Sequence, residues 1–249
     1  MSTPLPTVPV LHSEWIKIRS LRGALGALAA VCVATAGIQM LTAALTRGAE
    51  SGGIGDDPLL AAFYGINFGT IAAFAFGATA MASEFHNGAL RTSLTAVPSR
   101  TRFYLSKMAV VGGLAFLAGQ SAGLTAFIGG QAFMGRHALE LGDEGTYRAI
   151  FGCGLYLTLM ALLAAGLAAV LRSATVVLSL LIPFVLLVPF VLGSASEGAA
   201  RFLPDRAGQA VMRMESPDGL GPWTGIGVLA LWALVSMVGG WLEVRRRDA

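Results

Sequence analysis

Six long stretches of this chain contain no Asp, Glu, Lys, Arg or His. A helix needs about 20 apolar residues to cross a hydrocarbon core of about 30 Å, and one charged group near its centre costs about 2.5–3.5 kcal/mol. Each stretch satisfies both conditions. They cover residues 24–45, 59–82, 108–134, 149–171, 174–192 and 223–242. The sequence therefore predicts an all-α, polytopic membrane protein in which six transmembrane helices form one domain over residues 1–249.

The composition excludes a soluble globular domain. Only 12% of the residues are charged and 55% are hydrophobic, whereas a globular protein has about 25% charged residues. A chain with so little polar surface needs the lipid bilayer as its solvent. One polar break, Arg172 and Ser173, divides the 45 residues from Ala149 to Gly193. A single helix of that length would extend about 67 Å, so we expect a turn at Arg172.

Basic residues are concentrated on one side of the predicted membrane topology. Six spans place both termini on the same side, together with the segment 83–107 and Arg172. This side carries eleven of the seventeen Lys and Arg residues and four of the fourteen acidic residues, a net charge of +7. The other three loops have a net charge of −4. Because cytoplasmic loops are enriched in Lys and Arg, we expect a plasma-membrane protein with both termini in the cytoplasm.

Two segments outside the spans are predicted to lie at the membrane surface. Leu11, Trp15 and Ile18 recur at helical spacing, which predicts an amphipathic elbow helix before the first span. The alternative is a basic flank that only fixes orientation. The loop 194–222 has apolar pieces that two prolines keep too short to cross. We expect outer re-entrant helices there, with a disordered loop as the alternative.

The segment between the second and third spans is predicted to contain a short amphipathic helix. Leu90 and Leu94 begin an apolar stripe that Gly88 precedes and Pro98 ends. This helix would be only about 14 Å long, so it cannot cross the membrane. We expect it to lie across the cytoplasmic end of the bundle. Its polar face, which includes Arg91, would meet a soluble partner; an ordinary basic loop is the alternative.

The residues that lead into the third span have the character of membrane anchors. Phe103, Tyr104 and Lys107 combine aromatic rings with a positive charge. Such residues are enriched where a helix passes from water into lipid. We therefore expect these three side chains at the membrane interface.

Seven positions between the second and third predicted spans form an ordered pattern. They are Glu84, Gly88, Leu90, Leu94, Pro98, Arg100 or Arg102, and Lys107. This pattern resembles the permease subunits of type 2 ABC (ATP-binding cassette) exporters, in the short form familiar from actinomycetes. The resemblance extends over nearly the whole chain, because the amphipathic start, the six spans, the long loop before the last span and the basic end also have counterparts.

In that family the pattern forms the coupling helix, which sits in a cleft of the ATPase subunit. The residues assigned to ATPase coupling are Glu84, Gly88, Leu90, Arg91, Leu94, Pro98 and Arg100. The resemblance implies a cytoplasmic ABC ATPase in two copies, which bind ATP and Mg²⁺, and a second permease copy or paralogue. No nucleic-acid partner is expected. Ala89 replaces the usual Thr, and Arg91 stands where many members have an acidic residue.

The chain lacks the sequence motifs of an ATPase or another enzyme. It contains no G-x-x-x-x-G-K-[ST] and no H-E-x-x-H motif. Its one G-x-S-x-G match, residues 119–123, lies inside the apolar span 108–134 and not at the strand-to-helix turn of a nucleophile elbow. We therefore expect no catalytic residue, cofactor or metal site, with ATP hydrolysis in a separate partner. The absence of ionisable groups from the spans argues against a proton-coupled carrier. An ATP-independent membrane channel or scaffold is the alternative function.

Amide side chains inside the predicted spans are candidates for the lining of a transport pathway. They are Gln39, Asn67, Gln120 and Gln131. Between two permease copies, these groups would hydrogen-bond the polar atoms of a substrate. The alternative is hydrogen bonding between helices, which contributes about 0.6 kcal/mol for each residue. The sequence does not identify the substrate.

Overall fold

The computed structural model describes residues 7–46, 57–86, 89, 93, 95, 99–135, 138–195, 197–214 and 219–246. Within these ranges every regular element is helical and none is a strand, so the all-α prediction is confirmed. The elements are α1 (Thr7–Ser20), α2 (Arg22–Leu45), α3 (Pro58–Ala61), α4 (Ile66–Ala82), η1 (Ser83–Phe85), α6 (Arg100–Met134), α7 (Thr146–Leu171), α8 (Ala174–Ala195), α9 (Glu197–Ala200), α10 (Pro204–Gln209), η3 (Ala210–Met212) and α11 (Pro222–Arg246).

Five helical segments are long and apolar enough to cross a membrane. They are α2, α4 continued by η1, α6, α7 and α11, and they correspond to five of the six predicted spans. The sixth prediction, 174–192, falls on α8, where Ala174–Val188 is a shorter apolar helix. Helix α8 as a whole has 22 residues and extends about 33 Å, but that it crosses a membrane stays a prediction. Helices of this length and composition are typical of a membrane protein.

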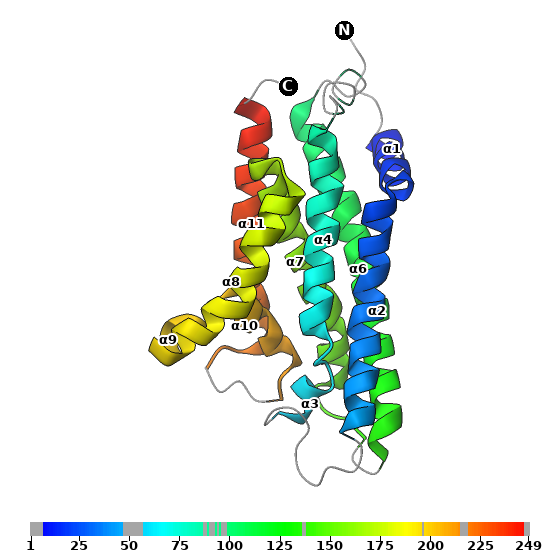
Figure 1. Ribbon diagram of the computed structural model, residues 1–249, viewed down its shortest axis with the longest axis vertical. Helices are drawn as coiled ribbons and strands as arrows, with labels where there is room; N and C mark the ends of the chain where they lie inside the picture. The colour runs from blue at the N-terminus through cyan, green and yellow to red at the C-terminus, as the bar shows by residue number, and fades with distance from the viewer. Residues whose placement is uncertain are drawn as a thin grey trace.

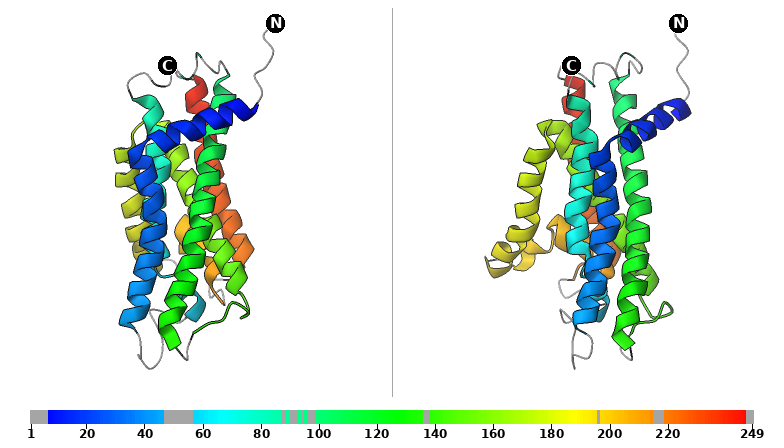
Figure 2. Two further views of the ribbon diagram at one scale, coloured as in Figure 1. Left: turned by 90° about the vertical axis from the view of Figure 1, so that its right-hand side faces the viewer. Right: turned by 45° about the vertical axis from the view of Figure 1, so that its right-hand side comes forward.

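The long helices run side by side in one bundle (Figure 1). Helix α7 is central, because it packs against α4, α6 and α11, while α2 packs on α4 and α6. Helix α8 leans away from the bundle, and α1 lies across one end of it (Figure 2). The end of α11 lies at the same end as α1 (Figure 1), which we call the terminal end; the other is the opposite end.

The predicted second span, 59–82, is broken between α3 and α4, which corrects the sequence prediction. The side chain of Gln39 in α2 fills the break: its Nε2 donates to the carbonyl of Ala61 (3.2 Å), and its Oε1 accepts from the N–H of Gly65 (3.2 Å). A Cβ at Gly65 would overlap the backbone oxygen of Thr35, so only glycine permits this approach. Helix α4 therefore begins only at Ile66, because the side chain from α2 forms hydrogen bonds with the backbone groups that the break leaves unpaired.

The loop 194–222 contains α9, α10 and η3. Both α10 and η3 pack against α7 and α11, and Val211 and Met212 are fully buried. The prediction of short helices in this loop is therefore confirmed for the described segments. That these helices enter a membrane from its outer side stays a prediction.

Replacing Gly77 by Ala should lower the free energy of unfolding in detergent by about 1–3 kcal/mol. A Cβ at Gly77 in α4 would overlap the backbone oxygen of Ala161 in α7, so the two helices would have to separate. Gly37 in α2 is the matched control, because an added Cβ there has no atom within 4 Å. We expect Gly37→Ala to be neutral or slightly stabilising. Equal thermal unfolding curves for the two variants would contradict the close α4–α7 contact.

Candidate functional site

Four charged side chains meet at the terminal end of the bundle and include both lysines of the chain. Lys107 of α6 is fully buried, and its Nζ lies 2.6 Å from Glu84 Oε1 and 3.0 Å from Glu14 Oε2. Lys17 Nζ lies 2.7 Å from Glu14 Oε1 and 3.5 Å from Glu84 Oε1. Each lysine thus contacts both glutamates. We call these four residues the charge cluster; its formal charges cancel.

Three separate elements supply the charge cluster. Glu14 and Lys17 stand three residues apart in α1, so they share one face of that helix. Glu84 lies in η1, which continues α4, and Lys107 lies two turns after the start of α6. Removing a single lysine or carboxylate from water costs several kcal/mol, which only close opposite charges offset. The cluster therefore holds α1, the end of α4 and the start of α6 together.

The predicted coupling segment reaches the charge cluster through Ser93. The Ser93 hydroxyl accepts a hydrogen bond from Lys17 Nζ (2.9 Å) and donates one to Glu84 Oε2 (3.0 Å). The carbonyl of Ala89 is a second acceptor at 2.9 Å. Within 87–98 the structure describes Ala89, Ser93 and Thr95, all three helical. The predicted coupling residues Gly88, Leu90, Arg91, Leu94 and Pro98 lie outside the described residues, so their roles stay predictions.

Glu84 and Lys107 belong to the sequence pattern, but Glu14, Lys17 and Ser93 were not assigned to the site from the sequence. Two signals point to them. Glu14 and Lys17 have the spacing of an ion pair within one helix. Lys17 and Lys107 are also the only lysines in a chain with fifteen arginines. A compact, flexible ammonium fits a small buried site that a planar guanidinium would not.

The anchor prediction for the residues before the third span is wrong. Phe103, Tyr104 and Lys107 are each at most 1% exposed. The Tyr104 hydroxyl donates to the carbonyl of Met237 in α11 (2.8 Å). These side chains face the interior because α6 begins well before its lipid-facing stretch and is covered there by α1 and α11.

Arg100, also assigned to coupling, lies at the first residue of α6. Its Nη1 donates to the carbonyls of Val244 (3.1 Å) and Arg245 (3.4 Å). These carbonyls are in the last turn of α11, where a helix leaves such groups without internal partners. Trp241 of α11 also donates to the hydroxyl of Thr101 (3.1 Å). The start of α6 is therefore fixed to the end of α11.

A hollow of about 510 Å³ lies on another side of the same region. Leu21 and Ala174 form part of its wall, together with Ser83 and His86 at the end of α4 and Ala89 of the predicted coupling segment. Close to it, the guanidinium of Arg172 lies 5.3 Å from the centre of the Phe85 ring. The predicted coupling segment thus borders a depression on the terminal end.

The four amides predicted for a transport pathway all have hydrogen-bond partners inside the chain. Gln39 fills the α3–α4 break, and Asn67 Oδ1 accepts from Gln209 Nε2 (3.1 Å). Gln120 donates to a carbonyl of α7 (3.0 Å), and Gln131 accepts from a backbone N–H after α6 (2.8 Å). Their place in a pathway between two copies stays a prediction.

A second polar cluster, not predicted from the sequence, joins α10 to α4 and α7. Asp205 Oδ1 accepts from the Tyr156 hydroxyl (2.5 Å) and from Gln209 Nε2 (2.9 Å). The Tyr156 hydroxyl also lies 3.0 Å from the hydroxyl of Thr70, and Gln209 also donates to Asn67. An acidic residue from a loop therefore reaches the interior, although the spans themselves contain none.

Burial raises the pKa of the Asp205 carboxyl above its ordinary value, although hydrogen bonds from Tyr156 and Gln209 and the charges of Arg206 and Arg213 partly oppose this. The native protein therefore holds this proton more tightly than the unfolded chain does. The resulting stabilisation is complete below the ordinary pKa of Asp and is lost as the pH rises through the raised pKa.

Asp205→Asn should therefore gain stability relative to the wild type as the pH rises above the ordinary pKa of Asp, because Asn keeps both acceptor contacts and loses no proton. Thermal unfolding at a series of pH values measures this difference. The exposed Glu144 supplies the control, and Glu144→Gln should follow the wild-type pH profile. Parallel profiles for wild type and Asp205→Asn would contradict the assignment.

Comparison with known proteins does not assign the chain to a family: no family model and no curated protein matches it. Over the part of the chain that the structure describes, no group of three or more His, Cys, Asp or Glu side chains could hold a metal ion. A functional assignment therefore depends on the charge cluster and on the sequence pattern that includes two of its members.

Proposed function

We propose that this chain is the membrane-spanning permease subunit of an ATP-driven exporter. The observation that carries the proposal is the attachment of the predicted coupling segment to the charge cluster. Ser93 contacts both Lys17 and Glu84, and Lys107 links Glu84 to the start of α6. A segment that transmits force from a docked partner needs such a fixed connection to the membrane helices.

The proposed architecture completes the bundle with elements at both membrane surfaces. In it α8 is the fifth of six spans, and the terminal end faces the cytoplasm of a plasma-membrane protein. Helix α1 serves as an elbow helix along the inner leaflet. Helices α9 and α10 enter from the outer surface. Residues 88–98 form the coupling helix.

The proposed mechanism separates energy supply from transport. Two copies of a cytoplasmic ATPase bind ATP and Mg²⁺ and close on each other. Their movement shifts the 88–98 helix, and the charge cluster passes this shift to α1 and α6. The interface between this chain and a second permease copy or paralogue then opens toward the outside. The chain supplies the pathway, and the ATPase supplies the energy.

Partner identification tests the proposal. The protein is tagged in its native cells, purified in mild detergent, and its stoichiometric partners are identified by mass spectrometry. We expect a cytoplasmic protein with a phosphate-binding loop, and we expect Leu94→Arg to remove it. The matched control is Leu141→Arg, the same change at an exposed position beyond the opposite end of α6. This control should retain the partner.

Two results would contradict the proposal. Recovery of the protein alone in several detergents, without ATPase activity, would favour an ATP-independent channel or scaffold. Recovery of the ATPase with Leu94→Arg as fully as with the wild type would place the docking surface elsewhere. Membrane insertion of each variant is checked by its yield in the membrane fraction, so that a folding defect is not counted as lost docking.

A further inference from the structure

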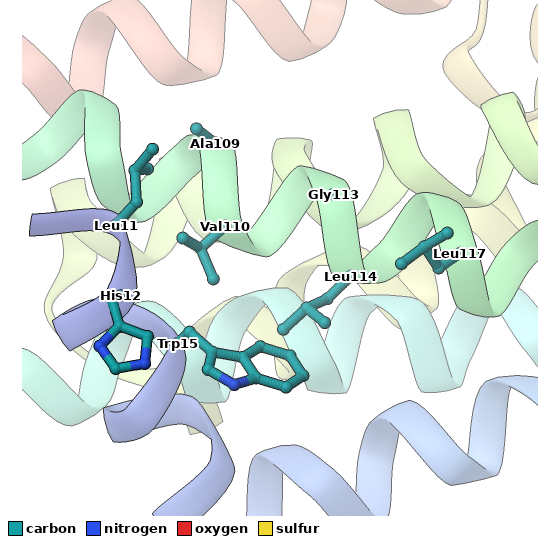
Figure 3. A pocket seen from close by; sticks show the side chains of 8 residues that line it. All are labelled: Leu11, His12, Trp15, Ala109, Val110, Gly113, Leu114 and Leu117. Atoms are coloured by element: carbon teal, nitrogen blue, oxygen red, sulfur yellow. The ribbon is translucent and has the colours of Figure 1, made fainter. Parts of the chain in front are cut away.

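A groove of about 590 Å³ lies where α1 crosses α6, on the outer surface of the bundle. Leu11, His12 and Trp15 of α1 form one wall, and Val110, Gly113 and Leu117 of α6 are among the residues of the other (Figure 3). Trp15 points from α1 along α6 toward Leu114 (Figure 3). The groove thus begins at α1 and continues along a helix apolar enough to cross a membrane.

The lining of the groove is apolar except at one end. His12 is the only lining side chain with an ionisable group. Leu117, at the other end, is 67% exposed, and an added Cβ at Gly113 would have no atom within 4 Å. The floor at Gly113 is therefore open. Because α6 has the composition of a membrane span, this surface faces hydrocarbon and not water.

The length of the groove matches one leaflet. The residues of α6 that line it run from Ala109 to Leu117, which corresponds to about 12 Å along a helix. Half of a hydrocarbon core of about 30 Å is about 15 Å. A chain that enters beside His12 would reach the level of Leu117 near the centre of the bilayer.

The charges of α1 favour an anionic headgroup. The one acidic residue of α1, Glu14, is buried in the charge cluster. Arg19 is exposed, as is Arg22, the first residue of α2, which Leu21 separates from α1. The surface beside the groove therefore presents positive charge without exposed negative charge from α1. Basic residues at a membrane surface attract anionic lipids by about 1 kcal/mol each.

We propose that the groove between α1 and α6 binds an acyl chain of an anionic phospholipid from the leaflet that contacts α1. The apolar walls hold the chain, and the basic residues of α1 and α2 select the headgroup. This site is separate from the charge cluster and does not depend on the proposed transport function.

Fluorescence of Trp15 tests this site directly. The full-length chain carries four tryptophans, so Trp223→Phe, Trp232→Phe and Trp241→Phe leave Trp15 as the single reporter. The protein is reconstituted in vesicles that contain brominated phosphatidylglycerol or brominated phosphatidylcholine, because bromine quenches a neighbouring indole. We expect an apparent affinity about fivefold higher for phosphatidylglycerol, as one basic contact would give.

Gly113→Leu should abolish this preference, because the new side chain fills the open floor of the groove. Gly37→Leu adds the same side chain to an exposed, open position of α2 that does not line the groove, and it should leave the preference unchanged. If both lipids quench Trp15 equally and Gly113→Leu changes nothing, the groove contacts lipid without selecting it, and the proposal is overturned. If neither lipid quenches Trp15, the groove is occupied by protein, such as a second copy of the chain, and the proposal is also overturned. Thermal unfolding of each variant verifies that it is folded.

Discussion

Replacing Lys107 by Met should destabilise the protein by about 3–5 kcal/mol, because breaking a buried ion pair leaves charge in the interior without compensation. Met has a similar length, so packing changes little. Glu14 and Glu84 would remain buried with Lys17 as their only cation in the cluster, and the Lys17 side chain is 35% exposed. A loss of this size is a large part of an ordinary folding free energy of about 5–15 kcal/mol. Yield in the membrane fraction and thermal unfolding in detergent measure the effect.

The double variant Glu84→Gln, Lys107→Met separates charge from packing. It leaves the Glu14–Lys17 pair in place and is neutral, so it should be more stable than Lys107→Met alone. Arg19→Met, an exposed change at the same end, should stay close to the wild type. A double variant no better than the sum of its single changes would show that the two side chains do not interact. Wild-type stability for Lys107→Met would contradict the structural role of the charge cluster.

Most of the helical architecture follows from the absence of charge in the apolar stretches. Lipid provides no partner for an interrupted backbone, so a long uncharged stretch has few alternatives to a helix. The prediction failed within residues 59–82, where a break occurs. There the side chain of Gln39 takes over the backbone hydrogen bonds, and Gly65 permits the approach of α2. Such a contact between helices leaves no signature in the hydrophobic period of either helix.

The candidate site was only partly predictable for a related reason. Glu84 and Lys107 are 23 residues apart and were identified by the order of residues around them. Glu14 and Lys17 come from a helix whose contact partners depend on how α1 crosses the bundle. Asp205 lies in the predicted outer loop, yet the folding of α10 onto α7 and α11 brings its carboxyl against Tyr156. In each case the sequence shows the chemical group, while tertiary packing decides what it meets.

Exchanging the charges of one pair should not rescue the charge cluster. If Glu84 and Lys107 formed an isolated pair, the double variant Glu84→Lys, Lys107→Glu would restore the attraction. The cluster instead alternates in sign, and each lysine lies within 3.5 Å of both glutamates. The exchange would place a second carboxylate against Glu14 and a second ammonium against Lys17. We therefore expect this variant to be at least as unstable as Lys107→Met.

Reversing all four charges is the test that distinguishes a cluster from a pair. The fourfold variant Glu14→Lys, Lys17→Glu, Glu84→Lys, Lys107→Glu again has opposite charges at every contact. It should recover part of the stability that the double exchange loses, because two like-charge contacts become attractive. Thermal unfolding of both variants in the same detergent measures the recovery. A double exchange as stable as the wild type would mean that Glu14 and Lys17 contribute little, and that Glu84 and Lys107 alone hold α4 to α6.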